Sequence, residues 1–432
     1  MIEKLKNGMK NAVSKGFFHI LGGNTLVKFI SLFSALLLPR LLTKEEFGQL
    51  AYVDNMYSYL LLVNGLGINA AILRFVAVAQ DEAEKKEVFK YSLKFGIMAD
   101  FVICILMSIV LFFMRVPLDG VKKYLFFIIF LPIPILAFEC ISSYLRSNFQ
   151  NKKYSLLSIA YTLMSALLQV AFAWKFKIFG AITARYITAF AAVAFGMLLI
   201  GGSHFSFRKT EDRQRKILDK AYRRNIFKFA FAALAASGFS LILPLNEQMV
   251  LTQIFKSETM TANYRASSLG AQNIQIITMS VVVFIYPYFA RHTNDGKWLW
   301  KSYKKVASGL LAGVGALSVA AYFLTPYLVP LIFGEKYRDI IGLMSFMWLT
   351  FGINAVVRMP VGNILASVGE VKFNLINAFA SSLVHIILDI IFIKKMGING
   401  AAIALTITYL LSGVAGVVYF KGFCKRKVQI NE

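Results

Sequence analysis

The fold is decided by the stretch from Phe17 to Arg74, which reads FFHILGGNTLVKFISLFSALLLPRLLTKEEFGQLAYVDNMYSYLLLVNGLGINAAILR. It contains two apolar runs separated by a short polar hinge, and a helix needs about 20 such residues to cross a bilayer. Each run carries a charge well inside it, Lys28 in the first and Asp54 in the second. Because an ionised side chain near the bilayer centre costs about 2.5–3.5 kcal/mol, we expect both to face a bundle interior or a wet cavity rather than lipid.

The composition of the chain is typical of a polytopic membrane protein. Hydrophobic residues make up 58% and charged residues 16% of its 432 residues, whereas soluble domains have about 45–50% and about 25%. The net charge of +25 does not indicate nucleic-acid binding, because the basic residues lie in short clusters between apolar segments. Three scattered cysteines have neither disulfide nor metal-site spacing. We therefore predict no nucleic-acid partner, no metal and no cofactor.

Apolar windows predict an all-α integral membrane protein with about twelve transmembrane helices. The windows are 17–39, 47–74, 90–114, 123–146, 154–174, 178–201, 225–246, 266–290, 304–326, 339–366, 373–393 and 398–420. The first run lacks a small-residue cleavage site, so we interpret it as a retained helix. The boundaries are weakest at two places where prolines follow closely, after Leu131 and after Thr325. We count one span at each place, because a proline kink is tolerated where neighbouring helices satisfy the backbone.

The distribution of Lys and Arg between the loops predicts the orientation. An even number of spans places both termini on one side, and that side carries the denser basic clusters. They are Lys4 to Lys15, Lys85 to Lys90, Lys152 and Lys153, Arg208 to Arg224, Arg291 to Lys305 and Lys421 to Lys427. The positive-inside rule makes this side cytoplasmic. We predict a multi-pass protein of the inner, cytoplasmic membrane with both termini in the cytoplasm.

A polar stretch from His204 to Asn225 divides the chain nearly in half. It predicts an N-terminal lobe over residues 1–208 and a C-terminal lobe over residues 209–432, with six helices each. An internal repeat supports the division, since residues 220 positions apart match in register without a gap. The matched pairs include Gly180 with Gly400, Ala184 with Ala404, Thr188 with Thr408, and Gln169 with Asp389. The pseudo-axis of such a parallel repeat runs along the membrane normal.

Several basic residues lie within the apolar spans. Lys28 and Arg185 belong to the N-terminal half, Arg358 lies in the tenth predicted span, and Arg74 is near a span end. Arg74 alternatively reaches to lipid phosphates, and Arg185 and Arg358 are equally compatible with structural roles. An interior lined by cations favours an anionic ligand, and Arg binds phosphate in a bidentate fork. We therefore predict Lys28, Arg74, Arg185, Arg358 and Asp54 as the substrate-binding set.

Acidic residues and a histidine also fall inside the spans. His385 and Asp389 are one helical turn apart, and we consider both a packed pair and a proton or ion relay, because His titrates near neutrality. They are the predicted ion-coupling residues. Asp100 and Glu139 are expected to pair with a basic residue for structural reasons.

The chain resembles the polysaccharide-repeat-unit flippases (Wzx type) of the multidrug/oligosaccharidyl-lipid/polysaccharide (MOP) exporter superfamily. The segments that carry the resemblance are NTLVKFISLFSALLLPRLLTKEEFGQLAYV, NGLGINAAILRF, LVPLIFGEKYRD, NILASVGEVKFNLINA and GINGAAIALTITYLL. The resemblance covers nearly the whole chain and is more specific for the superfamily than for the substrate.

This resemblance implies two six-helix lobes around a central cavity, in the MATE-like (MOP) fold. It implies an undecaprenyl-pyrophosphate-linked oligosaccharide as cargo, moved by alternating access for surface polysaccharide such as lipopolysaccharide or capsule. Membrane lipids, a coupling proton or Na⁺ and a polysaccharide polymerase are the implied partners. The family commonly lines its cavity with cationic side chains, which Lys28, Arg74 and Arg185 match in type and approximate position.

Two alternatives stay open. The first is a drug or cation antiporter of the same fold, in which Asp54, Glu139 and Asp389 would matter instead of the cations. The absence of a carboxylate between Phe17 and Pro39 counts against it. The second is a membrane polysaccharide polymerase or ligase, an enzyme. We disfavour it because the longest expected exterior loop, residues 247–264, has no His and no acid/base cluster.

Overall fold

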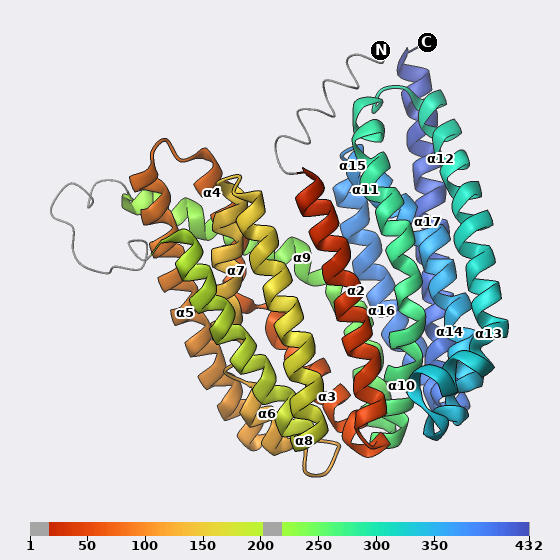
Figure 1. The fold of residues 1–432 in the computed structure, drawn as a ribbon. Helices are drawn as coiled ribbons and strands as arrows, with labels where there is room; N and C mark the ends of the chain where they lie inside the picture. The colour runs from red at the N-terminus through yellow and green to blue at the C-terminus, as the bar shows by residue number, and fades with distance from the viewer. Residues whose placement is uncertain (1–16, 202–217, 432) are drawn as a thin grey trace. The chain divides into compact units, whose positions relative to one another are not determined.

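The computed structural model describes residues 17–201 and 218–431, and every regular element in these ranges is helical (Figure 1). Side chains at 17–26, 28–29, 235–244 and 430–431 are outside the description. The elements of the first half are α2 (Phe17–Leu41), α3 (Lys44–Leu62), η1 (Asn64–Gly67), α4 (Ile68–Val78), α5 (Glu82–Phe113), α6 (Lys122–Ile128), α7 (Pro132–Ser147) and α8 (Asn151–Ile200).

The second half contains further helices, some of them interrupted by short 3₁₀ or π segments. They are α9 (Lys220–Phe255), α10 (Glu258–Ala271), η4 (Gln272–Ile274), α11 (Gln275–Arg291), α12 (Gly296–Leu310), η5 (Leu311–Gly315), α13 (Ala316–Phe333), η6 (Glu335–Ile340), α14 (Ile341–Ile353), η7 (Asn354–Arg358), α15 (Met359–Ser367), α16 (Val371–Met396) and α17 (Ile398–Asn431).

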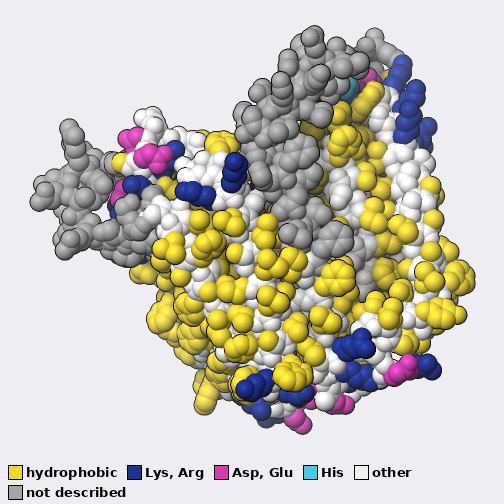
Figure 2. Space-filling view, viewed as in Figure 1, with side chains coloured by type: hydrophobic (Ala, Val, Ile, Leu, Met, Phe, Trp, Pro, Cys, Tyr) yellow, Lys and Arg dark blue, Asp and Glu magenta, His cyan; other side chains and the backbone are white. Residues whose placement is uncertain are grey.

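The helices have the length and surface of membrane spans, which confirms the predicted all-α membrane class. Within the described residues, nine helices are long and apolar enough to cross a bilayer, and the 50-residue α8 counts once among them. Large hydrophobic side chains face outward, for example Phe113 at 78% and Leu198 at 80% exposure. Figure 2 shows hydrophobic side chains along the middle of the helices and charged ones at the helix ends. The predicted number of twelve spans remains a prediction.

The chain forms two compact units, which we describe separately. Unit 1 comprises residues 1–42 and 56–238, and unit 2 comprises residues 43–55 and 239–432. The core of unit 1 is built by α4, α5, α7 and α8 around Phe89, Leu136 and Tyr144. The core of unit 2 lies among α10, α14 and α17 around Met347 and Leu405. The lobe division at residue 208 remains a prediction.

The second predicted span is broken in the middle. Its first helix, α3, begins at a capping box, in which Thr43 and Glu46 exchange backbone-to-side-chain hydrogen bonds. After α3 the backbone is left-handed at Gly65, Leu66 and Gly67, with φ of 55°, 51° and 78°. A Cβ at Gly65 would lie 2.4 Å from Leu136 Cδ1. The break therefore requires glycine both for its backbone and for its packing.

The 220-residue repeat is confirmed by backbone geometry. Lys177 has φ 54° and ψ −134°, and Gly397, 220 positions later, has φ 66° and ψ −146°. Phe149 and Gly369 form a second left-handed pair at the same spacing. A Cβ on Gly180 would lie 2.0 Å from Phe172 O, and one on Gly400 would lie 2.1 Å from Phe392 O. The same two turns thus recur in each unit.

One expectation about the loops is wrong. The long exterior loop expected at residues 247–264 does not exist, because α9 continues to Phe255 and α10 begins at Glu258. Only Lys256 and Ser257 separate the two helices, and the Ser257 hydroxyl caps α10 by accepting from Met260 N. This correction places Glu247 inside a helix, where it is 2% exposed.

Candidate functional site

Three titratable side chains meet in the interior of unit 2. Helix α9 supplies Glu247, and α16 supplies His385 and Asp389 from one face of consecutive turns. His385 Nε2 lies 3.3 Å from Asp389 Oδ2. One ligand atom from each of the three residues lies within 4.8 Å of the others. We call these three residues the acidic–histidine cluster. His385 and Asp389 have no exposed surface.

Hydrogen bonds of α17 fix the orientation of the imidazole. Thr408 Oγ1 donates to Ala404 O at 2.8 Å and lies 3.2 Å from His385 Nδ1. Because the threonine proton is used on the carbonyl, its oxygen acts as the acceptor and Nδ1 carries the hydrogen. The other nitrogen, Nε2, therefore faces the two carboxylates. In the neutral ring this nitrogen is an acceptor that needs a proton or a cation.

The acidic–histidine cluster has more acceptors than donors. His385 Nε2, both oxygens of Asp389 and Glu247 Oε1 are buried without a hydrogen-bond partner. The hydroxyl of Tyr264 on α10 hydrogen-bonds to Glu247. Buried polar atoms are rarely left unpaired, and adjacent buried carboxylates repel each other. The arrangement therefore suits a proton shared among the three groups or a small cation held by them.

The repeat shows how unit 2 differs from unit 1 at this place. The positions 220 residues earlier hold Ser165, Gln169 and Thr188, where Gln169 Nε2 donates to Ser165 Oγ at 2.7 Å. Thr188 donates to Ala184 O, just as Thr408 donates to Ala404 O. Unit 1 thus has a neutral, satisfied pair in the place where unit 2 has His385 and Asp389. Packing of this helix pair does not in itself require titratable groups.

The two predicted cations of unit 1 with described side chains lie in different surroundings. Arg74 is exposed, and its guanidinium lies over the rings of Phe229 and Phe75, at 4.5 and 5.7 Å from their centroids. Arg185 on α8 is half-buried and acts electrostatically on Tyr57 and Tyr161. The side chain of Lys28 lies outside the described residues, although its backbone is helical in α2.

The other two members of the predicted substrate set belong to unit 2. Arg358 ends the π segment η7, donates to Ser412 Oγ at 3.1 Å and lies over the ring of Tyr409. Its charge also acts on His385. Asp54 lies on α3 and is half-buried. Arg358 is therefore next to the acidic–histidine cluster, a neighbourhood that the sequence reading did not anticipate.

Sequence reasoning missed Glu247 and Tyr264, because both fall in the exterior loop that the sequence predicts at residues 247–264. The signal that identifies a helix there is the apolar pattern after Glu247, in which Val250, Leu251 and Ile254 continue the helical period. His385 and Asp389 were found because they share one face at a spacing of four residues.

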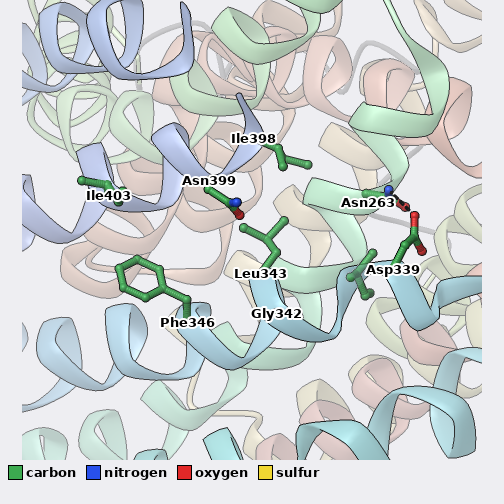
Figure 3. A pocket seen from close by; sticks show the side chains of 9 residues that line it. Asn263, Asp339, Gly342, Leu343, Phe346, Ile398, Asn399 and Ile403 are labelled. Carbon is green, nitrogen blue, oxygen red and sulfur yellow. Dashed lines mark hydrogen bonds between the residues drawn. The ribbon is translucent and has the colours of Figure 1, made fainter. Parts of the chain in front are cut away.

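A separate pocket of about 440 Å³ opens in unit 2, away from the acidic–histidine cluster (Figure 3). Its floor is apolar, with Leu343 and Phe346. At its edge Asp339 accepts from Asn263 Nδ2 at 2.8 Å and pairs with Lys44 at 2.5 Å. This pair joins the start of α3 to η6. None of the predicted site residues lines the pocket.

The fold is similar to several solved transporter structures. An inward-facing multidrug resistance MATE family transporter of the MOP superfamily matches with a TM-score of 0.75 and 14% identity, covering 93% of this chain and 96% of the other. The lipid II flippase MurJ in an inward closed conformation matches with 0.70 and 14%, covering 95% and 90%. A MOP superfamily transporter from Pyrococcus furiosus, described as having a binding pocket of reverse polarity, matches with 0.57 and 15%, covering 97% of each chain.

Sequence comparison agrees with this fold. An uncharacterised membrane protein of Methanocaldococcus jannaschii is 24% identical over 203 residues, which are 46% of this chain. The match covers 39% of that relative, so it spans about two fifths of its length. Residues 13–293 match the family model described as polysaccharide biosynthesis protein. The chain is thus a multi-pass membrane protein with the fold of MOP superfamily transporters, and it belongs to the polysaccharide biosynthesis protein family.

Proposed function

We propose that this protein is a flippase that moves undecaprenyl-pyrophosphate-linked oligosaccharide units across the cytoplasmic membrane by alternating access. The observation that carries the proposal is a polysaccharide biosynthesis family match on a chain with a transporter fold. A saccharide with a pyrophosphate does not cross lipid unaided, because its charge must leave water. The product would serve surface polysaccharide such as lipopolysaccharide or capsule, and a polysaccharide polymerase would be the partner that consumes it.

The cations of the predicted substrate set would hold the pyrophosphate. Arg185 is the best placed of those described, because it is half-buried in an apolar span beside two phenols. A guanidinium in such surroundings replaces part of the water that a phosphate loses. Lys28 and Arg74 would supply further positive charge for the pyrophosphate. Arg358 and Asp54 are the other predicted members of the substrate-binding set. The polyprenyl tail would stay in lipid.

The acidic–histidine cluster would couple transport to a gradient of protons or Na⁺. Its orphaned acceptors require a positive charge, and the charge of Arg358 acts on His385. Occupancy of the cluster would therefore bias the conformation of η7 and α16, which carry these residues. A ligand shifts a conformational equilibrium only through such differential contacts. The role of His385 and Asp389 as coupling residues is thereby extended to Glu247.

A drug or cation antiporter is the alternative function, and the buried carboxylates of the acidic–histidine cluster favour it. The two functions differ in which residues recognise the cargo. A flippase for an anionic head group depends on Arg185 and Lys28. An antiporter for cations depends on its carboxylates and tolerates loss of these positive charges. In both cases the protein would be a transporter rather than an enzyme.

The decisive experiment measures translocation of a radiolabelled lipid-linked oligosaccharide by the purified protein in proteoliposomes. Arg185→Ala is expected to lower the rate about 10–100-fold, since a hydrogen bond to a charged group contributes about 1.5–3 kcal/mol. Arg185→Lys should recover part of the loss. Lys153→Ala is the matched control, because this lysine is exposed and donates to Leu199 O at a helix end.

The proposal fails if the protein moves cationic dyes but not the lipid-linked oligosaccharide. It also fails if Arg185→Ala and Lys28→Ala both retain full oligosaccharide transport. Asp389→Asn is expected to abolish the response of the rate to a pH or Na⁺ gradient while leaving binding of the cargo intact.

A further inference from the structure

A second pair of acids, the buried Asp100 and the half-buried Glu139, lies in unit 1 at the break in the second span. Asp100, in the middle of α5, is 1% exposed. Its Oδ1 accepts from Gly65 N at 2.6 Å, at the first left-handed residue of the break. A helix that is broken within the membrane needs partners for its freed backbone groups. Asp100 thus serves as the acceptor that satisfies the broken backbone.

Glu139 on α7 is held by the residues that flank the same break. Its Oε2 accepts from Asn69 Nδ2 at 2.5 Å and from Asn64 Nδ2 at 3.3 Å. The amide of Asn69 is oriented in turn by the thiol of Cys140, which donates to Asn69 Oδ1. Two amide donors stabilise an ionised carboxylate. The break is therefore tied to two carboxyl groups, one on each neighbouring helix.

The described side chains and backbone groups that donate to Asp100 and Glu139 are amides, and the pairing with a basic residue predicted from the sequence stays a prediction. The two carboxyl groups act electrostatically on each other. Asp100 Oδ2 has no partner, and neither has the amide oxygen of Asn64, which is only 9% exposed. Two carboxyl groups this close repel each other when both are ionised, so the protonation of one of them is favoured.

We infer that Asp100 and Glu139 form a second proton-binding site, in which Asp100 carries a proton on Oδ2 while Glu139 stays ionised. The two carboxyl groups have different numbers of hydrogen-bond donors, and this difference decides which of them is protonated. Glu139 has two amide donors, whereas Asp100 has one backbone donor and a bare oxygen. The proton also supplies a donor to a neighbourhood in which the Asn64 oxygen lacks one. This site is independent of the cargo and of the acidic–histidine cluster.

A proton fits the site better than a metal ion does. Na⁺ and the divalent ions need several oxygen ligands, and only two oxygens here are buried without a partner. Within the described residues, the side chains that come together with metal-ligand spacing are in unit 2, not at this pair.

The other titratable groups around the pair do not compete for this role. The thiols of Cys104 and Cys140 face it, but they donate to Ile129 O and to Asn69. The phenols of Tyr57 and Tyr161 face Glu139 from α3 and α8. Arg185 acts electrostatically on these two phenols.

Proton binding would control the geometry of the second span. With the proton, Asp100 satisfies Gly65 N–H at no net charge, and the left-handed turn persists. Without the proton, the two carboxylates repel each other across the break. The position of Asp100 beside the break then becomes unfavourable. Leu66, a non-glycine residue with φ 51°, makes the turn strained. The broken conformation of the second span is thus close enough in free energy to other conformations for the binding of one proton to shift the equilibrium between them.

The test uses dicyclohexylcarbodiimide, which modifies protonated carboxyl groups in apolar surroundings. The purified full-length protein in lipid nanodiscs is labelled at a series of pH values, and the adducts are located by peptide mass spectrometry. We expect Asp100 to be modified at neutral pH and Glu139 not. In Glu139→Gln the like charge is gone, so modification of Asp100 at alkaline pH should fall several-fold. Glu87→Gln, on the same helix at a surface pair with Lys90, is the matched control and should change nothing.

A stability measurement keeps the inference testable without labelling. The melting temperature of the wild type should fall as pH rises and the site loses its proton. Asp100→Asn retains an acceptor for Gly65 N–H and needs no proton, so its melting temperature should be less sensitive to pH. The inference is overturned if Glu139 is modified in place of Asp100, if neither is modified at any pH, or if Na⁺ alone protects Asp100.

Discussion

At the residue scale, the acidic–histidine cluster has more hydrogen-bond acceptors than hydrogens to share among them. The Thr408 hydroxyl is used on Ala404 O, so His385 presents a bare Nε2 to Asp389 and Glu247. Three groups that all act as acceptors are stable together only when at least one carries a proton or when they share a cation. We therefore propose that folding and the binding of a proton or cation are linked at this site.

The repeat suggests a variant that removes this linkage without disturbing the packing. His385→Ser and Asp389→Gln copy the residues of unit 1, and Glu247→Gln removes the third group. We expect this triple variant to fold and to lose its ion-dependent stabilisation, which is about 2.7 kcal/mol for the wild type at 100 times the Kd of the ion. Thermal unfolding with and without Na⁺, and at two pH values, measures the difference.

Gln169→Ala is the control for this experiment, because it changes the corresponding helix of unit 1, where the pair is already neutral. Its response to ions should equal that of the wild type. A triple variant that still responds fully to Na⁺ and to pH would exclude the acidic–histidine cluster as the ion site.

Single residues also show which parts of the site could be predicted from the sequence alone. His385 and Asp389 were predictable, because a spacing of four on an apolar helix places two polar groups on one face. Glu247 was not, because His385 and Asp389 are more than 100 residues away from it in the sequence and its local sequence is that of a loop. For Arg358, the sequence indicated depth in the membrane but not its neighbours Ser412 and Tyr409.

At the scale of elements, the repeat places equivalent breaks in the two units. Lys177 and Gly397 interrupt the helical backbone with nearly the same angles. The conformation is one that glycine adopts freely and that side chains with a Cβ resist. Only unit 1 therefore has strain at this turn, because a lysine stands there in place of the glycine.

Lys177→Gly is expected to stabilise the protein by about 1 kcal/mol, since relief of the strained φ exceeds the added chain entropy of glycine. Lys177 is exposed, so little packing is lost. Gly397→Ala should destabilise by a similar amount for the same reason. The measurement is the free energy of unfolding in mixed micelles. If Lys177→Gly is less stable than the wild type, the lysine side chain contributes more than the turn costs.

The extents of the helices show which features of the elements the sequence alone did not predict. Apolar windows predicted the all-α membrane class correctly, because the bilayer demands about 20 apolar residues whatever the tertiary contacts are. The helix ends were missed, since α9 continues beyond its window to Phe255 and α17 to Asn431. Polar residues at the helix ends fall outside the apolar window, although they still belong to the helix. The break at Gly65–Gly67 depends on Asp100 from another helix, which no local pattern reveals.

At the scale of the whole molecule, the distribution of basic residues predicts how the chain lies in the membrane. The net charge of +25 is concentrated in particular loops. The cluster from Lys421 to Lys427 closes α17 on the side predicted to be cytoplasmic, while Lys336 and Arg338 in η6 lie on the opposite side. Basic loops are retained in the cytoplasm during insertion. The same asymmetry should therefore place both termini there.

Reporter fusions test this orientation. Alkaline phosphatase, which is active only after export, should be active when fused after Arg338 and inactive when fused after Lys427. A fluorescent protein that folds only in the cytoplasm should give the opposite pattern, which controls for expression. Replacing Lys421, Lys425, Arg426 and Lys427 together by Gln weakens the signal that retains the last loop, so some phosphatase activity should appear in the C-terminal fusion. If phosphatase is instead active after Lys427 in the unmodified chain, the termini are outside, and the cations proposed to receive the cargo would have to be approached from the other side of the membrane.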